Sequence, residues 1–88
     1  MSYDTRMFYA QAHIYPGVPL TRREVQVLKL AACIASGKDV AQMLGIKHQT
    51  VKNHLRNTYI KLRAYNRTDA VMRAIGAGYF SARSVCVD

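Results

Sequence analysis

Four side chains that can donate hydrogen bonds recur at helical spacing in the second half of the chain. They are Gln49, Lys52, Asn53 and Arg56. At about 100° per residue, a helix places all four within an arc of roughly 100°. The opposite side of the same stretch carries apolar residues, namely Val51, Leu55, Tyr59 and Leu62. One face of this helix is therefore expected to pack against the protein, and the other to face a partner.

The charges around this face indicate that the partner is an anion. From residue 45 to residue 67 the sequence has six lysines and arginines, two histidines and no acidic residue. An ordinary solvated helix, which is the alternative interpretation, mixes both signs of charge. In the major groove of double-stranded DNA, arginine or lysine pairs with guanine O6 and N7, and asparagine or glutamine with adenine N6 and N7. The pattern therefore predicts a helix that contacts base edges.

Length and composition limit what else the chain can do. Its 88 residues suffice for one small domain but not for an enclosed active-site cleft of usual size. The formal charge of +8 favours a polyanionic partner, nucleic acid before an anionic membrane surface. No apolar run approaches the roughly 18 residues of a spanning helix, and the first residues lack a signal pattern. We expect a cytoplasmic protein without membrane association. No set of residues suited to catalysis stands out, so neither an enzyme nor a cofactor is expected.

The histidines and cysteines do not predict a metal site or a disulfide. His48 and His54 are six residues apart, a spacing that does not put them on one face of a helix. His54 is expected to edge the core or to bond backbone or phosphate. Cys33 and Cys86 lack paired spacing and are expected to be reduced thiols, Cys33 being a small buried apolar group.

Residues 1–19 are expected to form an arm separate from the domain. They hold four of the eight aromatic residues and end in Tyr-Pro-Gly-Val-Pro, which indicates turn and extended backbone. A short helix over about residues 4–12 would let its aromatics pack on the domain, on a second copy or on a protein partner. A partly ordered leader is the alternative.

Capping patterns predict the helices that hold the polar face in place. Thr21-x-x-Glu24 is a capping box, so a helix should begin just after Thr21 and end at Ser36-Gly37. Its apolar face includes Val25, Leu28, Ala32 and Ala35, with Val27, Leu30, Ala31 and Ile34 beside them. Arg22, Arg23 and Lys29 lie off that face.

Ser36, with Asp39 third after it, can cap a second, short helix whose apolar side is Val40, Ala41, Met43 and Leu44. Gly45 suits the left-handed residue after a helix end.

A last helix completes the domain. Asn66-x-x-Asp69 can cap it, and it should stop near Gly76 or Gly78. Its inward residues are expected to be Ala70, Val71, Ala74 and Ile75, with Met72 either inward or on an outer stripe. A short helix, a tight turn with glycine and a longer helix with a polar outer face form a helix-turn-helix. We therefore expect an all-α fold of four helices over residues 20–80, followed by a tail at 81–88.

The sequence resembles the LuxR/GerE-type helix-turn-helix domain over about residues 20–80. The matching motifs are Leu20-Thr21-Arg22-Arg23-Glu24, Val27-Leu28, Val40-Ala41, Leu44-Gly45-Ile46, Thr50-Val51-Lys52-Asn53-His54-Leu55, Lys61-Leu62 and Arg67-Thr68-Asp69-Ala70. The resemblance implies a transcription-regulator domain that puts its third helix, about residues 47–62, in the major groove and often dimerises through its fourth. It implies base contacts by Lys52, Asn53 and Arg56, and phosphate contacts by Gln49 and Thr50. It further implies a single-domain, GerE-like regulator or a fragment, since family members usually carry another domain before this one.

Four residues depart from the family pattern. Lys47 stands where serine usually caps the recognition helix, so one N–H loses its acceptor at a cost of about 1 kcal/mol. Its positive charge also opposes the helix dipole, or else serves a DNA phosphate. Arg63 replaces a glycine, so the helix runs on or Arg63 adopts a left-handed conformation. Ile34 replaces a glycine and can lengthen the first helix. Ile60 occupies an outward position that is often acidic, and DNA contact alone does not explain it.

The sequence thus predicts a sequence-specific regulator that binds double-stranded DNA as a homodimer on an inverted-repeat operator. Its expected DNA contacts, beyond those named for the recognition helix, are Lys47, His48, Arg22 and Arg23. An outer stripe of the last helix supplies the dimer interface: Met72, Ile75, Gly76 and Tyr79. The first alternative is an interaction protein that uses the arm and Ile60 to bind another regulator or RNA polymerase. A sigma-factor region of the polymerase is a third hypothesis.

Overall fold

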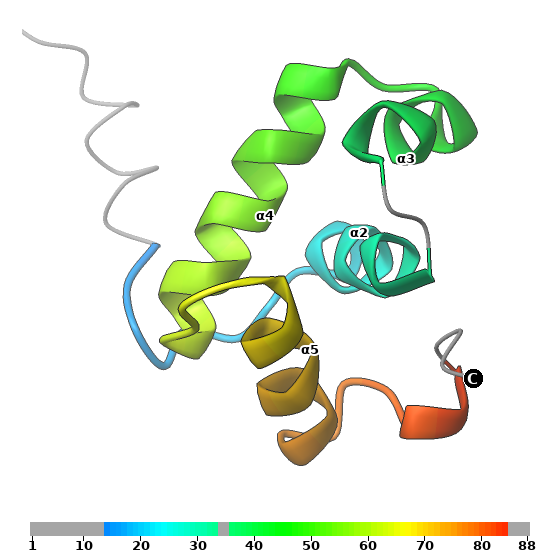
Figure 1. The fold of residues 1–88 in the computed structure, drawn as a ribbon. Helices are drawn as coiled ribbons and strands as arrows, with labels where there is room; N and C mark the ends of the chain where they lie inside the picture. Colours follow the sequence, from blue (N-terminus) through cyan, green and yellow to red (C-terminus); the bar gives the residue numbers. More distant parts are fainter. Residues whose placement is uncertain (1–13, 34–35, 85–88) are drawn as a thin grey trace, which may run out of the picture.

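The computed structural model describes residues 14–33 and 36–84, and within them the fold is all-α (Figure 1). Four α-helices follow one another: α2 (Arg22–Cys33), α3 (Gly37–Leu44), α4 (His48–Leu62) and α5 (Arg67–Gly76). A single turn of 3-10 helix, η1 (Ala82–Ser84), comes after them. The predicted fold class and the predicted order of helices over this part of the chain are confirmed.

The first helix begins as its sequence predicts. Thr21 Oγ1 accepts a hydrogen bond from the N–H of Glu24 at 3.1 Å, and Glu24 Oε1 accepts one from the N–H of Thr21 at 2.9 Å. The capping box is therefore formed in both directions. Within the described residues α2 reaches Cys33, which is half-buried rather than fully buried, and the predicted end of the helix falls on positions 34–35 outside them. The effect predicted for Ile34 lies outside the described residues, as do Cys86 and the predicted helix at residues 4–12.

The two later caps form with small differences from the prediction. Ser36 caps α3, but its hydroxyl accepts from the N–H of Lys38 at 3.2 Å rather than from Asp39. Asn66 Oδ1 accepts from the N–H of Asp69 at 2.9 Å, as predicted for α5. The Asp69 carboxylate does not return to Asn66. It accepts instead from the N–H of Tyr65 and from the Arg73 side chain, both at 3.0 Å.

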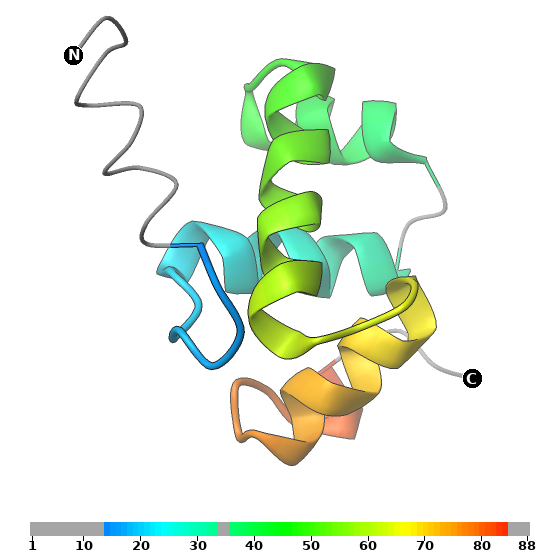
Figure 2. The same ribbon diagram turned by 90° about the vertical axis from the view of Figure 1, so that its left-hand side faces the viewer.

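The helices pack into two apolar clusters that meet on α2 and α4. The first joins α2, α3 and α4 through Val27, Val40, Ala41 and Val51, with Leu30, Leu44, Ile46 and Leu55 against them. The second joins α2, α4 and α5 through Leu28, Ala70 and Ala74, with residues such as Leu55, Tyr59, Leu62 and Tyr79 against them. Figures 1 and 2 show α4 crossing α2, with α3 near its start and α5 near its end. The apolar stripe predicted for α4 is thus the side that holds it in place.

Met43 contradicts the packing expected for its helix. It was placed on the apolar side of α3, but its side chain is 62% exposed. Val40 and Ala41 are the buried residues of this two-turn helix, so its inner side does not include Met43. Met72 is 62% exposed as well, which decides between its two predicted positions in favour of the outer one.

Residues 14–20 are hydrogen-bonded to the helices, although an arm separate from the domain was expected. The N–H of Gly17 donates to the carbonyl of Lys61 at 3.0 Å, inside a turn closed by Val18 N–H and the Tyr15 carbonyl. Gly17 has a φ of 91°, which glycine adopts without strain. The N–H of Leu20 donates to Tyr79 Oη at 3.0 Å. The chain before α2 is therefore attached to the last turn of α4 and to the residues after α5.

Candidate nucleic-acid interface

The polar face of α4 is exposed along four of its residues. Gln49, Lys52, Asn53 and Arg56 are all exposed, while Val51 on the opposite side is fully buried. The helical wheel inferred from the sequence is therefore correctly phased. In Figure 2 α4 lies at the front of the molecule, with α2 and α3 behind it. The four polar side chains project from a helix that is itself held on its other side.

The side chains on this face differ in whether they are hydrogen-bonded to one another. Gln49 Nε2 donates to Asn53 Oδ1 at 3.1 Å, one helical turn away. This bond aligns the two amides and leaves the Asn53 NH₂ group and the Gln49 carbonyl oxygen for an outside partner. Lys52 and Arg56 make no hydrogen bond or ion pair with any described residue. The face therefore combines a pre-aligned amide pair with two uncompensated cations.

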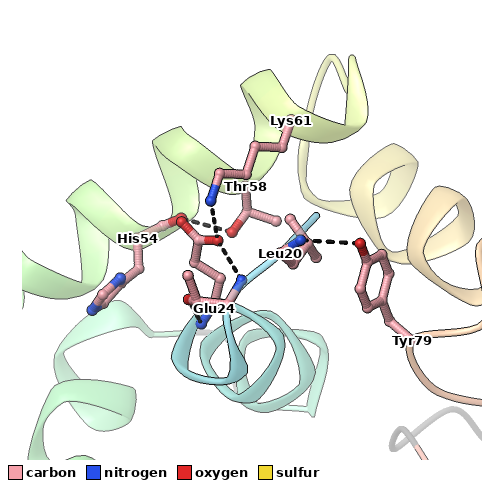
Figure 3. Close-up of polar contacts among 7 residues, drawn as sticks. Leu20, Glu24, His54, Thr58, Lys61 and Tyr79 are labelled. Atoms are coloured by element: carbon pink, nitrogen blue, oxygen red, sulfur yellow. Dashed lines mark hydrogen bonds and ion pairs between the residues drawn. The ribbon is translucent and has the colours of Figure 1, made fainter. Parts of the chain in front are cut away.

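Lys61 belongs to the six basic residues counted between residues 45 and 67, but it is buried in an ion pair. Its Nζ lies 2.7 Å from Glu24 Oε1, and the two side chains are only 6% and 4% exposed (Figure 3). The same carboxylate oxygen accepts the capping bond from Thr21, so it joins the start of α2 to the last turn of α4. Lys61 was counted among the cations awaiting an anion, but its anion is inside the protein. A signal was available, because the wheel puts Lys61 well away from the arc of the other polar residues.

Fewer basic residues of this region are available to an outside anion than the six counted from the sequence. Arg67 Nη1 donates to the carbonyl of Ala31 at 3.3 Å, so it also serves the fold. The other four of the six are exposed: Lys47, Lys52, Arg56 and Arg63. Arg22 and Arg23 are exposed at the start of α2, where Arg23 Nη1 donates to Gln26 Oε1 at 3.2 Å. These exposed lysines and arginines still form a positively charged surface, although Lys61 and Arg67 are bonded within the protein.

The start of α4 has two features that bear on anion contact. Lys47 is the N-cap residue and supplies no side-chain bond, as the sequence predicted, and the first turn has no acidic residue. His48 is half-buried against the start of α3, and a Cβ on Gly37 would lie only 2.9 Å from its Nε2. The first residue of α3 therefore lies close to the His48 ring at the start of α4. Thr50 is half-buried in the same turn.

The end of α4 is set by an arginine in the left-handed conformation. Arg63 has φ 57° and ψ 39°, and its N–H donates to the carbonyl of Ile60 at 3.2 Å. Of the two outcomes left open by the sequence, the helix does not run on. Thr58 is fully buried one turn earlier, and its hydroxyl donates to the carbonyl of His54 at 2.7 Å (Figure 3).

A shallow depression adjoins the exposed face near this end. It measures about 230 Å³ and is lined by Ile14, Arg56, Asn57 and Ile60. Ile60 is 39% exposed, as its outward position predicted. Asn57 Oδ1 is buried without a hydrogen-bond partner in the described part of the chain. Neither Ile14 nor Asn57 was a predicted site residue, because the contact depends on how the segment before α2 folds back.

The predicted dimer stripe on α5 is only partly available at the surface. Met72 and Gly76 are exposed and Ile75 is half-buried. Tyr79 was expected beside them, but its ring packs in the second apolar cluster and its hydroxyl accepts from Leu20. The turn after α5 brings the ring back toward α2, so Tyr79 serves the domain itself.

A two-turn helix, a turn with left-handed Gly45, and a longer helix with an exposed polar face define a helix-turn-helix domain. Residues 18–74 match the family described as bacterial regulatory proteins, luxR family. This match covers more than half of the chain, and the protein therefore belongs to that family. Within the described residues, no helix is long and apolar enough to cross a membrane.

Three relatives show the extent of the similarity. The chain is 45% identical over 56 residues to the HTH-type transcriptional regulator MalT of Vibrio campbellii, covering 64% of this chain and 6% of that protein. It is 42% identical over 62 residues to the transcriptional regulatory protein DesR of Bacillus subtilis, covering 70% and 31%. It is 39% identical over 64 residues to the transcriptional regulatory protein DegU of Brevibacillus brevis, covering 73% and 27%. The match thus spans less than a third of each of these relatives. Comparison with solved structures gave no significant match.

Proposed function

We propose that this protein is a transcriptional regulator that binds double-stranded DNA sequence-specifically and places α4 in the major groove. The observation that carries the proposal is the pair Lys52 and Arg56, exposed on α4 and without partners among the described residues, while Lys61 on the same helix is neutralised by Glu24. An anion on a binding partner would compensate the charges of Lys52 and Arg56, whereas the charge of Lys61 is already neutralised within the protein. This separation distinguishes a binding face from a helix that is basic all round.

Each residue of the face has a role that follows from its chemistry. Arg56 and Lys52 would donate to guanine O6 and N7, and Asn53, aligned by Gln49, would pair with adenine. Lys47, His48 and Thr50 at the start of α4, together with Arg22 and Arg23 on α2, would contact phosphates. Such contacts fix the position on the duplex without specifying sequence. The 15 residues of α4 span roughly 22 Å.

The experiment that tests this proposal is selection of bound duplexes from a random pool, followed by affinity measurements at several salt concentrations. Five cations are placed to displace counterions: Lys52, Arg56, Lys47, Arg22 and Arg23. Since each phosphate contact contributes about 0.9 to the slope of log affinity against log salt, we expect a slope of at least about 4 in magnitude. An affinity that stays flat between roughly 50 and 200 mM salt would contradict duplex binding of this kind.

We further propose that two copies act together on an inverted repeat. One recognition helix contacts only about three or four base pairs, and two-fold symmetry then requires two half-sites about one helical turn apart. The exposed part of α5, namely Met72, Ile75 and Gly76, is the proposed contact between copies. Such an interface is small, so dimerisation is expected to be weak off DNA and completed on it.

A further inference from the structure

The exposed stripe of α4 continues beyond Arg56 with an apolar residue. Ile60 follows Arg56 by four positions and Asn53 by seven, so a helix aligns all three along one side. Among the described large apolar side chains that are exposed, Ile60 is the one in α4. A charged or polar residue would be less costly there if the position faced only water. Its surroundings indicate what it faces instead.

Ile60 is one wall of the depression described above, and Ile14 is another. Ile14 is brought there by the turn in which Gly17 donates to the carbonyl of Lys61, directly after Ile60 in the chain. The two isoleucines make an apolar surface, and Arg56 lines the same depression. Arg56, a residue of the proposed base-contacting face, is therefore also a wall of this depression.

The major groove offers one apolar group that fits this arrangement. The edges of the four bases there carry donors and acceptors, except that thymine also exposes its 5-methyl group. Building on the proposed function, we infer that Ile60, with Ile14 beside it, contacts the methyl group of a thymine. Ile60 lies about 6 Å further along the helix axis than Arg56, so this thymine is expected within about two base pairs of the pair that Arg56 contacts. Ile60 is thus a specificity-determining residue.

Deoxyuridine provides the test, because it differs from thymidine by this methyl group alone. In a duplex selected by the full chain, each thymine is replaced in turn by deoxyuridine, and the dissociation constant is measured at fixed salt. At one thymine we expect wild-type affinity to fall about fourfold, as loss of one buried methyl group implies. The Ile60→Ala variant should bind the two duplexes equally. Arg56→Ala should lose specific binding to both duplexes, whereas Ile60→Ala should lose only the difference between them.

Two controls keep the result interpretable. Met43→Ala removes an exposed apolar side chain from α3 and should preserve the difference between thymidine and deoxyuridine. The melting temperature of Ile60→Ala should stay near that of the wild type, because the side chain is already partly exposed. If no thymine shows a methyl effect, or if Ile60→Ala retains it, the inference is overturned. If the chain binds no duplex at all, the proposed function itself fails.

Discussion

Leu55 and Arg56 are neighbours in the chain with opposite surroundings. Leu55 packs in both apolar clusters, while Arg56 is exposed and bonded to no described residue. The cost of removing each side chain should therefore appear in different measurements. We expect Leu55 to contribute to the free energy of unfolding and, if the proposed function holds, Arg56 to the free energy of DNA binding.

Arg56→Ala and Lys52→Ala should lose specific DNA binding and keep the stability of the wild type to within about 0.5 kcal/mol. Leu55→Ala should lower the free energy of unfolding by about 2 kcal/mol or more, because a well-packed leucine is truncated. Urea denaturation and gel-shift titration of the three variants measure the two effects separately. Equal destabilisation by Arg56→Ala and Leu55→Ala would mean that the face of α4 is wrongly assigned.

At the scale of elements, the Glu24–Lys61 pair fixes how α2 and α4 cross. The carboxylate also completes the capping box of α2, so one residue serves the start of one helix and the end of another. This pairing could not be predicted from the sequence. The capping box and the helical phase are local patterns, but the meeting of residues 24 and 61 depends on the packing of two helices that are far apart in the chain.

Lys61→Ala should destabilise the domain by about 3 kcal/mol, because it leaves a buried carboxylate without its cation. Lys52→Ala is the matched control, being the same substitution on the same helix at an exposed position. The midpoint of urea denaturation, with the slope of the transition checked for constancy, measures both. Similar midpoints for the two variants would show that the pair contributes little.

The start of α5 should make stability depend on pH in the acid range. The N–H of Tyr65, and then the Arg73 side chain, lower the pKa of Asp69 below its ordinary value of 3.8. A carboxyl group with a lowered pKa in the folded state stabilises the fold above the unfolded pKa, and this contribution is lost as pH falls through the lower, folded value.

The wild type should therefore melt at a higher temperature than Asp69→Asn at neutral pH, and the difference should shrink once the pH drops below about 3.8. Thermal unfolding of both proteins at a series of pH values measures it. A difference that stays constant over this range would exclude Asp69 as its source.

At the scale of the whole molecule, the proposed assembly of two copies on one inverted repeat makes a testable prediction. Met72→Glu adds charge to the exposed stripe of α5 and leaves each α4 intact. It should weaken binding to a full inverted repeat far more than binding to a single half-site. Titration of the two duplexes, with Tyr65→Glu as a control, compares these losses. Tyr65 is 88% exposed and lies outside the stripe, so its variant reports the general effect of added negative charge on DNA affinity.

An equal loss on both duplexes, or a monomer that binds one half-site tightly, would contradict an assembly through α5.

Tyr79 shows what sequence patterns could not predict about this surface. Helical spacing put it outward, but the chain turns after α5 and returns its ring to the core. Helix starts and the phase of α4 follow from neighbouring residues, whereas the partner of Lys61 and the surroundings of Met43 and Tyr79 depend on which segment of the tertiary structure covers them.

The position of Leu55 in both apolar clusters has a further consequence for folding. If α3 left the domain, Leu55 would lose packing that also supports α5, and the converse holds as well. The two halves of the core therefore share the free energy of one side chain and are expected to open together rather than in succession. A domain of this size would then have one cooperative unit, and its slowest-exchanging backbone amides on α2, α3, α4 and α5 would all report the same global unfolding event.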